Sequence, residues 1–362
     1  MNQRGFAHVA ILLFIVMIGV GIGVIVLLQK DTLPYQSEIS TEPTPTTISE
    51  SPPTPTEVMA HEDQDSDEVV YHTVDTTALP LGDDKYASSP QKGYVYTCMN
   101  TFNGGGAFTQ GPWIDTQTNT WDLTQKVSVD GTVSWPNASW SISSDGTTRT
   151  LAGNDLPTYH TTGTYPISST DDAYNYDRNP NAISKQSLSL SLPTNPTIAA
   201  NPQCVGGEVG IMLSGVLIFS AFDAGGRDAV ATEVQDSCQG HPQESGYYHY
   251  HGWSSCLQDD HAEGEHSDLV GYAFDGFGIY GLKGEQGVEI SSEDLDECHG
   301  HTHFIEWDGI SKEMYHYHMT QDFPYSVSCF KGEPVTKALS SNQSGQGPGN
   351  NLPPNGPPPP PR

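Results

Sequence analysis

Histidines occur in two similar short motifs in the second half of the chain. The sequence Tyr-His-Tyr-His stands at 248–251 and again at 315–318. Alternate side chains of an extended strand share a face, so the two histidines of each motif point one way and the tyrosines the other. Two imidazoles about 6.5–7 Å apart on one strand can bind a single ion. The spacing therefore predicts a histidine-lined metal site, with the tyrosines directed into a core and each hydroxyl bonded to a polar partner.

Other residues of metal-binding type lie close to these motifs. His241 and His301 each follow a cysteine by three positions, and Asp275 stands beside Gly276. A carboxylate can orient a metal-binding imidazole through its ring N–H, although Asp275 could instead cap the turn at Gly276. The predicted ligands are His249, His251, His316 and His318, with His241 and His301 in reserve and Asp275 as the orienting carboxylate.

The two motifs belong to a longer internal repeat. Residues 210–219 match residues 271–280 at a separation of 61, and Cys238 and Cys298 are separated by 60. A duplicated unit usually folds as two like halves packed together. If the halves meet about a pseudo-two-fold axis, the four imidazoles of the two motifs converge. Imidazole favours copper or zinc, and the many acidic residues leave calcium as an alternative.

Three functions are compatible with this site. The first is transition-metal binding. The second is an enzyme, in which imidazoles and a carboxylate act as acid and base, or an open metal position activates water. The third is a surface-binding or adhesion module with structural histidines, in which Trp253 and Trp307 contact a polymer. No Ser-His-Asp order or nucleophile elbow indicates acyl transfer, so no catalytic residue is assigned.

The charge of the chain excludes one class of partner. Lys and Arg number 14 and Asp and Glu number 44, which gives a net charge of −30. Nucleic-acid-binding proteins need basic patches, so no nucleic-acid partner is expected. The acidic surface favours cations, or serves solubility alone.

The beginning of the chain predicts a membrane anchor. Residues 6–28 are apolar except for His8, and a helix over 9–28 would be about 30 Å long, enough to cross the bilayer core. No small-residue cleavage site follows, so the anchor at 1–30 is expected to be retained. The membrane is then a partner, and the rest of the chain lies outside the cytoplasm.

Composition divides the remainder of the chain. An acidic Pro/Thr-rich stretch and a Pro/Gly-rich tail cannot bury enough apolar surface to fold. The expected parts are a linker at 31–92, a β-rich part at 93–200, a duplicated domain at 201–336 with repeats at about 210–256 and 271–329, and a tail at 337–362.

The ectodomain is expected to be mainly β. Alternating residues with Asp-Gly turns predict hairpins at 126–135 and 140–151. Residues 186–192 alternate Leu with Ser, and each copy of the repeat suggests two strands bent at a glycine. One short helix is expected at 227–236.

Six cysteines, all after the predicted anchor, favour disulfides in an exported protein. The repeat suggests Cys238–Cys256 and Cys298–Cys329 as equivalent bridges, which leaves Cys98 for Cys204. The alternative is a pair of Cys-x-x-His metal knuckles that contain His241 and His301.

These residues together resemble the YHYH-domain proteins of bacteria. The resemblance covers about 155–335. Gly278 departs from it, because proline is expected there. It implies no activity that can be carried over to this chain. The matching segments are 156–163, 176–181, 201–204, 210–219, 221–229, 233–238, 275–281 and 325–332, together with both Tyr-His-Tyr-His motifs.

Overall fold

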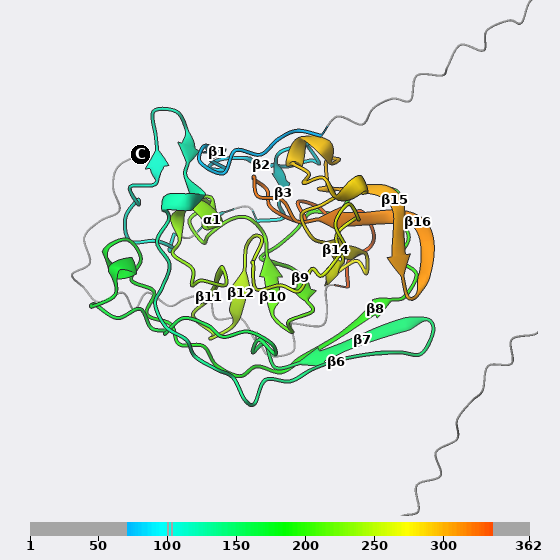
Figure 1. The fold of residues 1–362 in the computed structure, drawn as a ribbon, viewed down its shortest axis with the longest axis horizontal. Coiled ribbons are helices and arrows are strands. Elements are labelled where there is room, and N and C mark those ends of the chain that lie inside the picture. The colour runs from blue at the N-terminus through cyan, green and yellow to red at the C-terminus, as the bar shows by residue number, and fades with distance from the viewer. Residues whose placement is uncertain (1–70, 100, 103, 336–362) are drawn as a thin grey trace, which may run out of the picture. The chain divides into compact units, whose positions relative to one another are not determined.

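The computed structural model describes residues 71–99, 101–102 and 104–335, which form a mainly β structure (Figure 1). The predicted anchor, the tail from 337 and most of the linker lie outside these residues. Among the described helices, none has the length and apolar character needed to span a membrane.

An eight-stranded sheet contains both copies of the repeat. Its order is β11-β12-β10-β9-β13-β14-β16-β15 (Figure 1). The two copies meet at the centre of the sheet, and each copy contributes its corresponding strands in the same order from the centre to its own edge. The first copy supplies β9 (Glu208–Met212), β10 (Leu217–Phe219), β11 (Gly240–Pro242) and β12 (Tyr248–Tyr250). The second supplies β13 (Leu269–Ala273), β14 (Gly278–Tyr280), β15 (Gly300–Trp307) and β16 (Ile310–His318).

The register at the centre of the sheet relates the two copies. Strands β9 and β13 are antiparallel, with Ile211 opposite Tyr272, and these two residues are equivalent in the repeat. Each central strand turns into the next at a glycine with positive φ, 86° at Gly215 and 93° at Gly276. A side chain is strained there, which explains the glycine in both copies.

The tyrosines of both motifs point into the core, as the alternation predicts. All four are buried, and each hydroxyl meets a polar side chain. The pairs are Tyr248 with Asp236 at 3.0 Å, Tyr250 with Ser214 at 3.1 Å, Tyr315 with Asp296 at 3.0 Å and Tyr317 with Asp275 at 2.6 Å.

A three-stranded antiparallel sheet packs against the second copy. It contains β6 (Trp140–Ser144), β7 (Thr148–Gly153) and β8 (Leu188–Pro193), which confirms the hairpin at 140–151 and the strand near 186–192. The Trp307 indole donates to the Thr194 carbonyl at 3.0 Å, and the buried Arg149 guanidinium bonds Asp308 at 2.5 Å.

Three local features differ from the predictions. Residues 126–135 form no hairpin, because Val129 pairs with Asp236 and Val133 pairs with Thr162. The short helix expected at 227–236 is present but is only the single turn α1 (Ala229–Thr232), after which Glu233 is extended. The folded part begins before 93, since Leu79 is buried in β1 (Leu79–Pro80) and β2 (Tyr86–Ala87) follows.

Short elements complete the described part of the chain. The strands are β3 (Val95–Tyr96), β4 (Ile114–Asp115) and β5 (Thr120–Trp121), and the 3-10 helices are η1 (Leu123–Gln125), η2 (Asp172–Asn175), η3 (Glu285–Gly287) and η4 (Ser292–Asp294).

Three disulfides join the cysteines as the repeat suggested. The bonds are Cys98–Cys204, Cys238–Cys256 and Cys298–Cys329. The Cys-x-x-His knuckle is therefore wrong, because a disulfide sulfur offers no thiolate to a metal.

Candidate metal centres

The histidines form two separate groups rather than one. His241, His249 and His251 gather in the first copy, and His266, His301, His316 and His318 in the second. The expected convergence of four imidazoles from the two motifs is wrong. Four strands lie between β12 and β16 in the sheet, which places the motifs about 24 Å apart at the usual strand spacing.

The first group, called here the three-histidine site, is built on the paired strands β11 and β12. His241 lies opposite His249 in the register, and His251 follows β12 on the same face. The Nε2 atoms of His249 and His251 are 3.1 Å apart. Each of the three side chains belongs to a residue only 3% exposed.

Backbone carbonyls determine which ring nitrogens carry protons. The Nδ1 of His251 lies 2.6 Å from the Ser220 carbonyl, and that of His249 lies 3.3 Å from the Tyr247 carbonyl. A carbonyl only accepts, so each Nδ1 is an N–H donor and each Nε2 of a neutral ring carries a lone pair. Two lone pairs at this separation repel each other unless a cation lies between them.

A carboxylate completes the three-histidine site. The Oε2 atom of Glu233 lies 3.4 Å from Nε2 of His241 and 3.7 Å from Nε2 of His251. That oxygen and both ring nitrogens of His241 are buried and have no hydrogen-bond partner in the described part of the chain. Buried polar atoms are nearly always bonded, so this arrangement fits three nitrogen ligands and one oxygen ligand around an ion.

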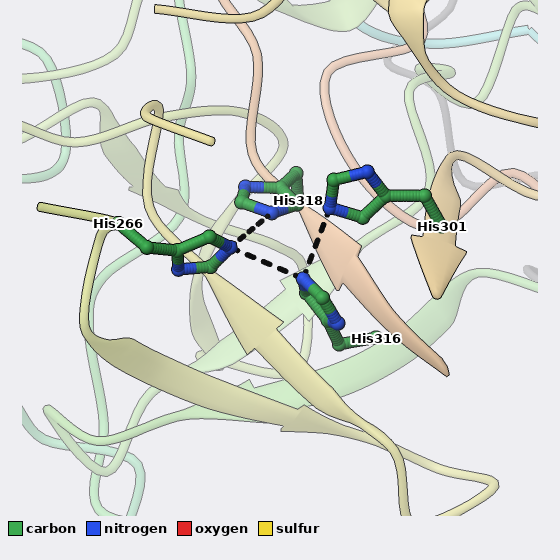
Figure 2. A group of neighbouring side chains, drawn as sticks. All are labelled: His266, His301, His316 and His318. Carbon is green, nitrogen blue, oxygen red and sulfur yellow. Dashed lines mark hydrogen bonds between the residues drawn. The ribbon is translucent and has the colours of Figure 1, made fainter. Parts of the chain in front are cut away.

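The second group, called here the four-histidine site, has its ring nitrogens turned toward a common centre (Figure 2). His316 and His318 come from β16, His301 from β15 and His266 from the segment before β13. The distances between Nε2 atoms are 3.2 Å for His266–His316, 3.1 Å for His301–His316 and 3.1 Å for His266–His318.

Carbonyls orient these rings as well. The Nδ1 atoms of His318, His316 and His266 bond the carbonyls of Gly281, Met314 and Ser267 at 2.7, 3.0 and 2.8 Å. Three Nε2 lone pairs therefore meet in one small volume. Gly281 and Met314 occupy the repeat positions of Ser220 and Tyr247, so the two sites use equivalent carbonyls.

The spacing of the donor atoms fits a tetrahedral transition metal. Metal–nitrogen bonds of about 2.0–2.1 Å place tetrahedral ligand atoms about 3.3 Å apart. Three Nε2 pairs of the four-histidine site lie 3.1–3.2 Å apart. In the other site the donor atoms lie 3.1 Å apart for His249–His251, 3.4 Å for Glu233–His241 and 3.7 Å for Glu233–His251. Both sets of residues thus fit an ion of this kind.

Burial keeps these imidazoles neutral, which is the form that binds metals. It lowers the pKa of His251 and of His301 to about 4, and that of His241, His249, His316 and His318 well below the usual range. Burial also raises the pKa of the Glu233 carboxyl well above its usual range, so a cation that binds there displaces a proton.

Asp275 belongs to neither site, which corrects its predicted role. Its carboxylate accepts from the Tyr317 hydroxyl at 2.6 Å and from the amides of Gly332 at 2.9 Å and Phe277 at 3.3 Å. It bonds no imidazole, because it lies on the tyrosine face of the sheet. Ser214 takes the same place in the first copy, where it meets the hydroxyl of Tyr250.

Sequence reasoning missed two members of the sites. Neither His266 nor Glu233 is among the ligands that the sequence predicts. The repeat gave no signal for either, since Glu293, the counterpart of Glu233, is exposed and His266 has Val205 at its position in the first copy. The fourth candidate ligand therefore comes from a different part of each copy.

Neither tryptophan that was expected to contact a polymer has an exposed side chain. Trp307 is 4% exposed, so it offers no surface to a polymer, and Trp253 is half-buried. His160 lies near Cys238 and Cys256, but both sulfurs are in a disulfide, and its Nε2 bonds the Tyr250 hydroxyl at 2.6 Å.

Comparison with known proteins finds that part of the chain matches a family model. Residues 189–292 match the model of the family described as YHYH protein, and this segment contains strands β9 to β14, the three-histidine site and His266. No curated protein and no solved structure matches the chain.

Proposed function

We propose that this chain, which carries a YHYH domain, is a metal-binding protein that holds two transition-metal ions, one in each histidine site. The observation that carries the proposal is the convergence of three Nε2 lone pairs in the four-histidine site, each fixed by a carbonyl at the opposite ring nitrogen. Such carbonyl partners are the usual means by which proteins orient metal-binding imidazoles.

The donor atoms favour zinc or copper. One site offers three imidazoles and a carboxylate, and the other offers four imidazoles. Imidazole-rich sites of nearly tetrahedral spacing suit zinc and copper, whereas calcium needs six to eight oxygen ligands. Calcium is therefore not proposed for either site.

We also propose where the protein lies in the cell and how its two halves arose. The apolar segment in 1–30 anchors the chain in the cell membrane, and the β domain lies outside the cytoplasm, where three disulfides persist. The equivalent strand order and the equivalent carbonyls support descent of both copies from one duplicated unit.

The test is the metal content of the full-length protein, purified without an affinity histidine tag. We expect two transition-metal ions per chain in the wild type, and one in each of the variants H249A/H251A and H316A/H318A. The control is H72A, which removes a histidine whose side chain is 63% exposed and should leave both ions bound. Folded wild-type protein that holds no metal after incubation with copper and zinc would refute the proposal.

A further inference from the structure

The second copy carries two residues beside its metal site that the first copy lacks. His303 follows His301 by two positions on β15, so both point to the same face. The Nε2 atom of His303 lies 3.2 Å from Oε1 of Glu285. The equivalent positions in the first copy are Gln243 and Ala224, which offer neither an imidazole nor a carboxylate.

This pair lies beside the four-histidine site, at a position that solvent reaches. The His303 ring is nearly parallel to the His266 ring, with centroids 5.8 Å apart, and lies 6.1 Å from the His301 ring. The side chains of His303 and Glu285 are 30% and 28% exposed, whereas His266 and His301 are partly buried and the inner histidines His316 and His318 are fully buried. An ion that enters at this side meets the pair before it meets the inner histidines.

The pair is also held in place and incompletely bonded. The Tyr71 hydroxyl donates to Oε2 of Glu285 at 2.5 Å, which leaves Oε1 directed at His303. The Nδ1 atom of His303 is buried and has no hydrogen-bond partner in the described part of the chain. Burial of an unbonded ring nitrogen is costly, and such atoms usually mark a function or a missing ligand.

We propose that His303 and Glu285 form an outer station that captures a transition-metal cation and passes it to the four-histidine site. The inference rests on the proposed function, since it requires that the inner site binds metal. The carboxylate attracts the cation, and the imidazole replaces part of its water before the ion reaches four uncharged ligands. The equivalent positions beside the three-histidine site, Gln243 and Ala224, provide no such station.

The outer station affects the rates of metal binding and release. A station outside the final ligand set is a step on the route in both directions. Its removal should therefore slow loading and release together and leave the dissociation constant unchanged. A residue that only supports the inner ligands would act differently, because its loss weakens binding through faster release.

The experiment follows Co²⁺ loading of the full-length protein through the visible absorption of the ion. The phase that is lost in H316A/H318A reports the four-histidine site, and the remaining phase is an internal reference. In H303A and in E285Q we expect loading and release to a chelator each to slow about tenfold or more, with an unchanged dissociation constant. The control E313Q removes an exposed carboxylate from the opposite face of β16 and should change neither rate.

Three outcomes would overturn the station. They are unchanged rates in both variants, weaker binding with an unchanged loading rate, and equal slowing of the three-histidine phase. Failure of the wild type to bind Co²⁺ at the four-histidine site is a separate result, which refutes the proposed function before any rate is measured.

Discussion

At the scale of single residues, the proton positions on the imidazoles decide what each site can bind. A carbonyl at Nδ1 leaves the Nε2 lone pair free, and in both sites these lone pairs face one another within a buried volume. Burial opposes a proton at the same place, since it lowers the pKa of every ring involved. Under the proposed function, we expect a metal cation to relieve this repulsion at less cost than protonation.

Glu233 provides a prediction at this scale. The substitution E233Q replaces a carboxylate ligand with an amide, so we expect the affinity of the three-histidine site to fall at least about tenfold. The four-histidine site should be unaffected. Competition with a chelator measures both constants, and E293Q is the matched control because Glu293 is the exposed counterpart in the other copy. Equal affinities of E233Q and the wild type would remove Glu233 from the ligand set.

At the scale of elements, each motif strand serves two purposes. One face of β12 or β16 presents histidines to a site, and the other buries tyrosines whose hydroxyls bond Asp236, Ser214, Asp296 and Asp275. These bonds hold the strand in register, because a shift by one residue would exchange the two faces. The tyrosine face thus positions the histidine face without touching a ligand.

Asp275 tests this division of roles. D275A leaves the Tyr317 hydroxyl and the Gly332 amide without their acceptor, so we expect the free energy of unfolding to fall by about 1–3 kcal/mol. Metal content should stay the same as in the wild type, because Asp275 contacts no imidazole. Denaturant unfolding and elemental analysis measure the two effects. Loss of metal from a variant that remains folded would restore the orienting role predicted for this carboxylate.

At the scale of the whole molecule, buried charges join segments far apart in the sequence. Asp228 caps α1, and its carboxylate accepts from the Gly82 amide at 2.9 Å and the Tyr325 hydroxyl at 2.7 Å. Burial nevertheless raises the pKa of this carboxyl to about 6. The group therefore links the stability of the domain to pH.

The sign of that linkage gives a prediction. The folded state holds the Asp228 proton more tightly than the unfolded state, whose pKa is 3.8, so this contribution is full below 3.8 and is lost as the pH rises through about 6. The difference of about two units corresponds to about 3 kcal/mol. Between pH 4 and pH 7 the wild type should lose up to this amount relative to D228N. Unfolding curves of both metal-free proteins across this range measure it, and parallel pH profiles would contradict it.

Much of this protein is determined locally by its sequence. The alternation of histidine and tyrosine sets the two faces of each motif strand, because the period of a strand is two residues. The glycines of the repeat mark its turns, and the spacing of the cysteines relative to the repeat indicates the three disulfides. The hairpin at 126–135 failed because its alternating residues pair with Thr162 and Asp236 instead of with each other.

Only the tertiary structure decided how many sites there are and what completes them. The strand order places β9 and β13 at the centre and the histidine strands near opposite edges, which separates the motifs into two sites. Glu233 comes from the extended residue after α1, and His266 comes from the loop before β13. Asp275 lies on the tyrosine face. Periodicity indicates which side chains share a face. Which faces meet depends on the long-range pairing of strands, which no local pattern contains.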